Sequence, residues 1–290
     1  MTPRPFLKWA GGKGQLLGRL RERVPPSYGR YFEPFLGGGA LFFALRPARG
    51  FLSDVNREII DCYTAVRDDV TGLVAALRHH RYDSKHYYDV RNADPAKLAL
   101  VERAARTIFL NKTGFNGLYR VNRAGKFNVP FGRYAKPAIC DEQNLRACSA
   151  ALADVELVAA DFERATSRAV AGDFVYFDPP YVPLSRTAAF TAYAPGGFDL
   201  DAQSRLAAFF DKLAERGVAV LLSNSDVPEI RKLYARYAMD TIEATRTINC
   251  KATRRGPVRE LLVHHVASGT KRVLAPRKRT VASATRGGPD

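Results

Sequence analysis

The segment Asp178-Pro179-Pro180-Tyr181 has the residue types needed to hold a flat, weakly nucleophilic amine, and it directly follows the apolar run 174–177. A carboxylate accepts hydrogen bonds from an amine, and a tyrosine ring offers a face for a planar group. Two prolines stiffen the backbone between them. An aspartate and proline after a strand are also ordinary turn chemistry. Taken alone, the four residues leave both interpretations open.

A second candidate lies near the N-terminus, where Gly37-Gly38-Gly39 separates the strand-like run 31–35 from the apolar run 40–45. Such a triplet can bring the backbone against a ligand at the carboxyl end of a strand. Asp54 lies 17 residues after Gly37, close to the interval at which an acidic side chain reaches ribose hydroxyls. A glycine turn and a helix-capping aspartate are the plainer alternatives.

Neither glycine-rich turn is typical of a site for nucleoside triphosphates. The triplet lacks a following Gly-Lys-Ser/Thr, and Gly12-Lys13-Gly14 lacks the hydroxyl that would hold magnesium. A nucleoside without a triphosphate is the favoured ligand. The segment 6–13 adds the only tryptophan, Trp9, and a cation, although Trp9 could equally pack on a sheet.

The order strand, glycine turn, helix, strand predicts the opening of a doubly wound, mostly parallel α/β sheet of Rossmann-like type. Helical periodicity follows, broken by a loop-like segment at 111–134, and strand-like runs return at 155–158, 174–177, 218–222 and 261–266. We therefore expect a discontinuous catalytic domain (1–56 and 151–268), a mainly helical insertion (57–150) and a basic tail (269–290).

The composition is that of a globular protein in the cytoplasm. The chain has 290 residues, 46% of them hydrophobic and 26% charged, and its apolar runs are too short to span a membrane. No signal peptide is evident at the start. The five histidines and four cysteines lack the spacing of metal ligands, so we expect no metal and reduced thiols.

The net charge of +16 favours a polyanionic partner. Residues 269–290 carry six Lys or Arg and one Asp, so the rest of the chain still carries +11. The tail has little apolar content and is expected to be disordered. It is either a solvated end or a nonspecific anchor for nucleic acid.

In this order, the motifs resemble the Dam family of DNA adenine-N6 methyltransferases. The resemblance runs from Phe6 to about Val266, and its specific segments are 6–13, 33–39, 111–134, 178–185 and 190–193. It implies transfer of a methyl group from S-adenosyl-L-methionine to N6 of an adenine in double-stranded DNA, with S-adenosyl-L-homocysteine as product. The chain is expected to act as a monomer.

The resemblance also implies roles for particular residues. The cofactor-contacting positions would be Trp9, Lys13, Asp54 and Asp178, with Phe35, Gly37 and Gly39 shaping the pocket floor. The catalytic segment would be Asp178, Pro179, Pro180 and Tyr181. The residues facing DNA would include Lys8, Asn116, Leu118, Arg120, Arg133 and Tyr134.

The residue types suit this chemistry. The adenine N6 lone pair is delocalised into the ring, and hydrogen bonds from N6 to Asp178 and to the Pro179 carbonyl would concentrate it on nitrogen. Tyr181 would stack on a base extruded from the duplex, because the target atom cannot be reached inside it. The sulfonium is already a strong methyl donor, so the protein mainly aligns the reactants.

Base recognition requires other groups. Arg120 suits guanine O6 and N7, Asn116 suits adenine, and Leu118 suits a thymine methyl group. A single arginine in an isolated loop is more simply a solvated cation.

Other residues near the hairpin suit contacts that carry no sequence information. Arg133 and Lys126 are expected to contact phosphates. Phe115 would either insert where the base leaves the stack or anchor its loop to the core.

Two rival functions remain at this stage. An RNA methyltransferase would also use an Asp-Pro-Pro-Tyr segment, although the insertion between Asp54 and Asp178 favours duplex DNA. A noncatalytic DNA-binding protein could keep the fold, although the intact cofactor motifs oppose it. The resemblance to the Dam family in the hairpin implies GATC as the target, and another short adenine-containing site is the alternative.

Overall fold

The computed structural model describes residues 1–9, 11–122, 124–181, 198–245 and 257–266. The described strands form one seven-stranded sheet in the order β3-β2-β1-β4-β5-β7-β6. Their bounds are β1 Tyr31–Glu33, β2 Gly50–Asp54, β3 Val155–Ala159, β4 Phe174–Phe177, β5 Ala219–Ser225, β6 Ala238–Thr245 and β7 Pro257–His265. The neighbours from β3 to β5 are parallel, and β7 is antiparallel to both β5 and β6. The expected doubly wound, mostly parallel sheet is confirmed.

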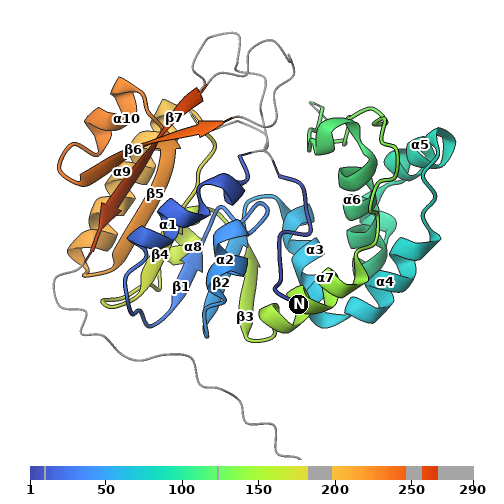
Figure 1. Cartoon of the computed structure of the whole chain (residues 1–290), viewed down its shortest axis with the longest axis horizontal. Coiled ribbons are helices and arrows are strands. Elements are labelled where there is room, and N and C mark those ends of the chain that lie inside the picture. Colours follow the sequence, from blue (N-terminus) through green and yellow to red (C-terminus); the bar gives the residue numbers. More distant parts are fainter. Residues whose placement is uncertain (10, 123, 182–197, 246–256, 267–290) are drawn as a thin grey trace, which may run out of the picture.

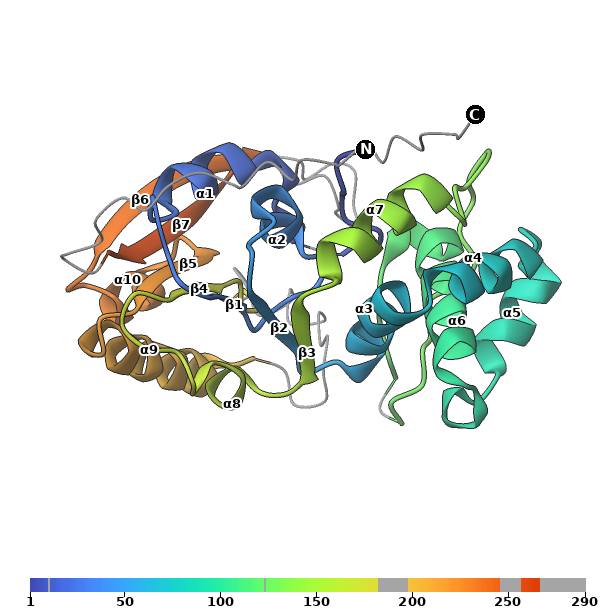
Figure 2. The same ribbon diagram turned by 90° about the horizontal axis from the view of Figure 1, so that it is seen from below.

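Helices cover both faces of the sheet, and a helical region stands beside it (Figure 1). Figure 2 shows α1 and α2 on one face and α8, α9 and α10 on the other. The α-helices are α1 Leu17–Arg23, α2 Ala40–Leu45, α3 Arg57–Asp68, α4 Val70–His79, α5 Ser84–Asn92, α6 Leu100–Thr113, α7 Glu142–Leu152, α8 Phe162–Thr166, α9 Leu200–Glu215 and α10 Pro228–Leu233. The described part of the chain also contains three short 3-10 helices, η1 Lys13–Gln15, η2 Pro95–Lys97 and η3 Phe115–Gly117.

The central strand β4 is buried on both faces, which explains its unbroken apolar sequence. Phe174 and Tyr176 belong to the core under α1 and α2, whereas Val175 and Phe177 belong to the core under α8 and α9. Successive side chains alternate between faces because a strand has a period of two. The residue that follows β4, Asp178, therefore starts from a rigid position.

The helical region shares a core with one face of the sheet. Leu20 of α1 and Phe43 of α2 belong to the same cluster of buried side chains as Ile59, Leu73 and Ile108 of α3, α4 and α6. The division of the chain into a catalytic domain and an insertion thus stays a prediction. No described helix has the length and apolar character needed to cross a membrane.

Several expected element boundaries were wrong. Strand β6 was missed because Ala238–Thr245 is a mixed polar sequence at the edge of the sheet. Helix α6 continues to Thr113, so the loop-like segment begins at Gly114 rather than at residue 111. The strand-like run 218–222 was too short, because β5 continues through Ser223 and Asn224 to Ser225. The segments 182–185 and 190–193 and the tail 269–290 lie outside the described residues.

Candidate active site

Three neighbouring strands place carboxylates side by side at their carboxyl ends. Strand β1 ends at Glu33, β2 ends at Asp54, and Asp178 directly follows β4. The order β2-β1-β4 makes these strands adjacent, and all three are parallel. The chain winds outward in opposite directions from β1 and β4, and such a switch point is where open α/β sheets bind ligands.

All contacts of Asp178 within the described residues are made by one carboxylate oxygen. Asp178 Oδ1 lies 2.8 Å from Lys13 Nζ and accepts a hydrogen bond from Ser223 Oγ, also at 2.8 Å. The Ser223 hydroxyl has one proton, so Tyr176 is the donor in their 2.9 Å contact. Among the residues that the structure describes, none donates a hydrogen bond to Oδ2, which can therefore accept from a ligand.

The Lys13 ammonium lies between the first and last residues of the candidate catalytic segment. The side chain is buried, and Nζ donates to the Gly11 carbonyl at 2.7 Å. Nζ also lies 4.6 Å from the centroid of the Tyr181 ring and 3.9 Å from Glu260 Oε2. Two carboxylates and a ring face therefore compensate this buried cation.

Tyr181 is fixed at its hydroxyl, which donates to Glu260 Oε2 at 2.6 Å. Burial raises the pKa of the Tyr181 phenol well above its usual range, and the nearby carboxylates of Asp178 and Glu260 raise it further. The phenol is therefore a neutral hydrogen-bond donor near neutral pH. Because Lys13 covers one face of the ring, a base must stack on the other face or displace Lys13.

Asp54 accepts a hydrogen bond from the backbone of the glycine loop. Its Oδ2 accepts from the Gly37 N–H at 3.0 Å, and Oδ1 accepts from the Asn56 N–H at 2.9 Å. Burial raises the pKa of Asp54 to about 6, although these two hydrogen bonds oppose the shift. Gly37 has φ +46°, and a Cβ there would lie 2.5 Å from Trp9 Cδ1. The loop therefore requires glycine at this position because Trp9 packs directly on it.

Phe35 belongs to an aromatic cluster next to the same edge of the sheet. Its half-buried ring stacks on Phe162 with a centroid distance of 5.6 Å and meets Phe198 edge to face at 5.5 Å. Gly39 begins α2 with φ +63°, and a Cβ there would lie 2.7 Å from the Tyr63 hydroxyl. The predicted cofactor residues thus come together around the carboxyl ends of β1, β2 and β4.

The predicted DNA-facing residues lie on the segment that follows α6, and this segment is tied to the N-terminal residues. Asn111 is buried at the end of α6, where Oδ1 accepts from the Lys8 N–H and Nδ2 donates to the Lys8 carbonyl, both at 2.7 Å. A Cβ on Gly117 would lie 2.4 Å from Lys8 Cδ. The two segments therefore form one surface in which Lys8 contributes its cation.

The hairpin beyond this point exposes polar groups above a small core that it shares with α5 and α6. Val121 and Phe127 form an antiparallel bridge, and Phe127 is buried together with Tyr119. Arg120 is exposed and donates from Nε to Asn128 Oδ1 at 2.7 Å. Asn116 is exposed in the left-handed region, with φ 54°. Both side chains have the exposure that base reading requires.

The other predicted DNA contacts differ in exposure. Phe115 is 44% exposed, and Lys126 and Arg133 are exposed, whereas Leu118 is half-buried against the hairpin core. Tyr134 is half-buried, donates its hydroxyl to the Gly114 carbonyl at 2.8 Å and stacks against Lys8 Nζ at 4.3 Å. Tyr134 therefore stabilises the segment, whatever its role toward DNA.

Comparison with known proteins identifies the family. The family model for D12 class N6 adenine-specific DNA methyltransferases matches residues 9–248. The chain belongs to this family. It is thus an S-adenosyl-L-methionine-dependent, adenine-specific DNA methyltransferase.

Similar proteins match about nine tenths of the chain. The Type II methyltransferase M1.LlaDCHI of Lactococcus lactis subsp. cremoris is 46% identical over 268 residues, covering 90% of this chain and 94% of the relative. The Type II methyltransferase M.MjaIII of Methanocaldococcus jannaschii is 43% identical over 286 residues, covering 91% and 99%. The DNA adenine methylase of Escherichia coli K12 is 36% identical over 263 residues, covering 89% and 94%.

Several residues around the methyltransferase site were not predicted from the sequence. Glu33 was noted only as part of a motif, yet burial, together with the nearby Asp178, raises its pKa to about 8. Ser223, Gln203 and Glu260 contact the segment from Asp178 to Tyr181. Of these residues, only Ser223 could have been suspected from the sequence, because the polar run 223–225 ends a buried strand, where polar groups are unusual.

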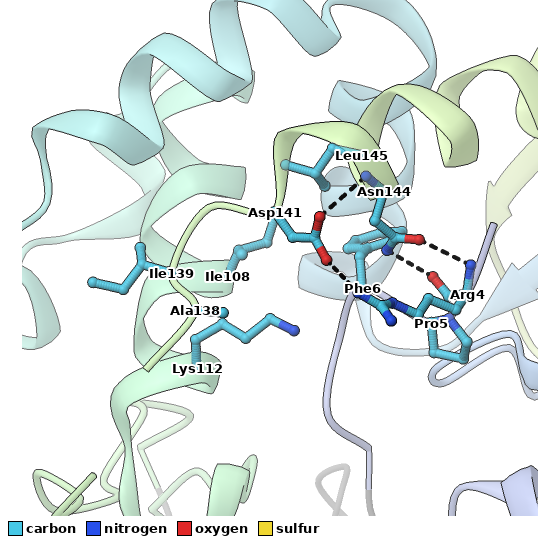
Figure 3. A pocket seen from close by; sticks show the side chains of 10 residues that line it. All are labelled: Arg4, Pro5, Phe6, Ile108, Lys112, Ala138, Ile139, Asp141, Asn144 and Leu145. Carbon is cyan, nitrogen blue, oxygen red and sulfur yellow. Dashed lines mark hydrogen bonds and ion pairs between the residues drawn. The ribbon is translucent and has the colours of Figure 1, made fainter. Parts of the chain in front are cut away.

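A separate cavity of about 230 Å³ lies between the N-terminal segment, α6 and α7 (Figure 3). Arg4 and Asp141 form an ion pair at 2.7 Å on its wall, and Asn144 exchanges two hydrogen bonds with the Arg4 backbone. Burial lowers the pKa of Lys112 there to about 8. The cavity contains none of the predicted site residues.

Among the described residues, no cluster of His, Cys, Asp or Glu has the geometry to hold a metal.

Proposed function

We propose that this methyltransferase transfers the methyl group of S-adenosyl-L-methionine to N6 of an adenine flipped out of double-stranded DNA, within the sequence GATC. The observation that carries the catalytic assignment is the asymmetry of Asp178. Its Oδ1 is held by Lys13 and Ser223, which leaves Oδ2 as an oriented acceptor. A carboxylate fixed in this way can accept an N6 proton without reorganising.

The groups at the carboxyl ends of β1, β2 and β4 suit the methyl donor. S-adenosyl-L-methionine supplies an activated methyl group, a positive charge, ribose hydroxyls and a planar ring. Asp54 would accept from the hydroxyls with its remaining lone pairs, and the aromatic cluster at Phe35 would accommodate the ring. The Trp9 contact with Gly37 shapes the loop that closes the site.

The residues of the catalytic segment have separate tasks in this proposal. Asp178 Oδ2 and the Pro179 carbonyl accept the two N6 protons and concentrate the lone pair on nitrogen. Tyr181 stacks on the extruded base. Lys13 and Ser223 keep the Asp178 carboxylate in place, so alignment of nitrogen and methyl group needs no rearrangement of Asp178.

The proposed target sequence rests on the hairpin. Exposed Arg120 and Asn116 suit guanine and adenine, and Leu118 offers an apolar contact for a thymine methyl group. Lys8, Lys126 and Arg133 would contact phosphates. We propose that the protein acts as a monomer on DNA in the cytoplasm, without a metal.

The test is expression in a host that lacks DNA methylation, followed by mapping of N6-methyladenine with its flanking bases. Methylation of adenine in GATC on both strands is expected. Methylation at a different sequence would refute the target but keep the reaction. Methylation of structured RNA in place of duplex DNA would overturn the proposed substrate.

A further inference from the structure

The segment from Asp178 to Tyr181 depends on side chains from other elements, because its two prolines have no backbone N–H to donate. Ser223 on β5 binds the first side chain of the segment at 2.8 Å, and Glu260 on β7 binds the last at 2.6 Å. Between them, Gln203 on α9 donates from Nε2 to the Pro180 carbonyl at 3.0 Å. Gln203 is the contact that acts on the backbone.

The orientation of the Gln203 amide follows from a chain of hydrogen bonds. The Ser225 backbone N–H can only donate, and it donates to Asn224 Oδ1 at 2.8 Å. Asn224 must therefore present Nδ2 to Gln203, and Nδ2 donates to Oε1 at 2.9 Å. This leaves Gln203 Nε2 facing the Pro180 carbonyl. The Ser225 N–H of β5 thus sets the orientation of both amide groups in this relay, which runs from Ser225 through Asn224 and Gln203 to the Pro180 carbonyl.

Both amide side chains are completely buried. Gln203 and Asn224 are each 0% exposed, although they sit on α9 and β5 among apolar neighbours such as Leu206 and Leu222. Burying two amides is costly unless both are hydrogen-bonded, and an apolar side chain would satisfy packing alone. The relay therefore supplies something besides packing, and the group at its end is the Pro180 carbonyl.

We propose that Gln203 is a positioning residue for methyl transfer, acting through the Pro180 carbonyl on the direction of the Pro179 carbonyl. The pyrrolidine ring restricts φ of Pro180, and the hydrogen bond from Gln203 restricts its ψ. Together they lock the peptide plane that carries the Pro179 carbonyl, one of the two acceptors for N6. This inference rests on the proposed catalytic role of the Asp178 to Tyr181 segment.

The decisive variant is Gln203→Glu, which tests the donor rather than the volume. An ionised carboxylate still accepts from Asn224 but repels the Pro180 carbonyl, whereas a protonated one can donate to it. Burial raises the pKa of a carboxyl group, so protonation occurs within an accessible pH range. We expect kcat at pH 8 to fall by about 10- to 100-fold and to recover as the pH is lowered toward about 6, since small misplacements of reacting groups cost rates of this order. KM for DNA and for S-adenosyl-L-methionine should change by less than about twofold, because only alignment of the reacting groups is lost.

Two further variants complete the test. Gln203→Met keeps the volume and removes the donor, so its kcat should be low at every pH. Ser204→Ala, one residue along α9, removes an exposed hydroxyl that donates to the Leu200 carbonyl and should match the wild type. A Gln203→Glu profile parallel to that of the wild type, or normal kcat in Gln203→Met, would overturn the inference.

If Gln203→Glu does not fold, Asn224→Asp tests the same relay from its other end. At pH 8 the introduced carboxyl group, when ionised, accepts from Ser225 and cannot donate to Gln203, so the Gln203 amide turns its oxygen toward Pro180. A lowered kcat with unchanged substrate KM is expected, and unchanged kcat refutes the relay. Full turnover of Asp178→Ala would refute the catalytic segment itself, whereas normal turnover of the Gln203 variants would remove only the relay.

Discussion

Lys13 Nζ lies 2.8 Å from Asp178 Oδ1, so the ammonium of the N-terminal glycine turn is ion-paired with the carboxylate that follows the central strand. The two residues are far apart in sequence and meet at the carboxyl edge of the sheet. The Lys13 side chain is buried, so this pair is screened little by solvent. The pair fixes one Asp178 oxygen and neutralises part of its charge beside the proposed site for the cationic methyl donor.

Replacing Lys13 by methionine should reduce kcat by about 10-fold or more, because truncating one partner of a buried charge pair typically costs 2–5 kcal/mol and leaves the other unpaired. Lys13→Arg keeps the charge but cannot keep the contacts with Asp178 and the Gly11 carbonyl in the same geometry. Its rate should lie between those of the methionine variant and the wild type. Steady-state methylation of a duplex oligonucleotide measures both. Equal rates for all three proteins would show that the pair is dispensable.

Asp178→Ala should abolish methyl transfer, with a loss of at least about 10²-fold in kcat, while DNA binding stays within a few-fold of the wild type. The reason is that Oδ2 orients the attacking nitrogen but carries none of the phosphate contacts. Single-turnover transfer of a radiolabelled methyl group, together with fluorescence anisotropy of labelled DNA, separates the two effects. Asp178→Asn is the matched control for volume. Turnover near the wild-type rate in the alanine variant is incompatible with the proposed role.

Arg120→Ala should cost about 1–3 kcal/mol at one base position and relax specificity there. Lys126→Ala, from the same exposed hairpin, should instead weaken binding on every sequence and reduce the salt dependence. Methylation of oligonucleotides with each base of the site replaced in turn measures both effects. A uniform loss for Arg120→Ala would assign it to a phosphate.

Glu33 should make the protein less stable as the pH rises. Its pKa is raised from 4.5 to about 8 by burial, so between these values the folded protein keeps a proton that the unfolded chain releases. The stability that this proton provides is fully present below about pH 4.5 and is lost as the pH rises through the folded-state pKa. Glu33→Gln stays neutral and can still accept from the Tyr31 hydroxyl, which donates to Glu33 Oε2 at 2.8 Å. The Tm of the variant should therefore rise relative to the wild type between pH 5 and pH 8, by about 2–4 °C for each kcal/mol. A constant Tm difference across this range would contradict the assignment.

Gly37→Ala should destabilise the protein by about 1–3 kcal/mol and weaken binding of S-adenosyl-L-methionine. The added Cβ would lie 2.5 Å from Trp9, and φ of +46° is unfavourable for alanine. Gly14→Ala is the control, because a Cβ there meets nothing within 4 Å. Urea denaturation and calorimetric titration measure the two effects. Equal stability of both variants would show that Trp9 moves aside freely.

Much of the fold was predictable because its signals are local. The apolar run before Asp178 predicted β4, and Gly37 to Gly39 predicted the turn between β1 and α2. Edge strand β6 has a mixed polar sequence and escaped prediction. The end of α6 was also missed, because asparagine is typical of loops. Asn111 is tolerated in the buried last turn of α6 because its amide forms two hydrogen bonds with the Lys8 backbone.

For the site, the sequence was sufficient to predict Asp178 as an acceptor and to propose roles for the glycine loop and the acidic strand end at Asp54, because each prediction follows from residue type and position relative to a strand. Only the tertiary structure decided which groups hold them. Lys13, Ser223, Gln203 and Glu260 come from different elements and reach the catalytic segment through packing of the sheet and α9. Such contacts join residues distant in the chain, and no local pattern specifies them, because the backbone path alone determines which side chains meet.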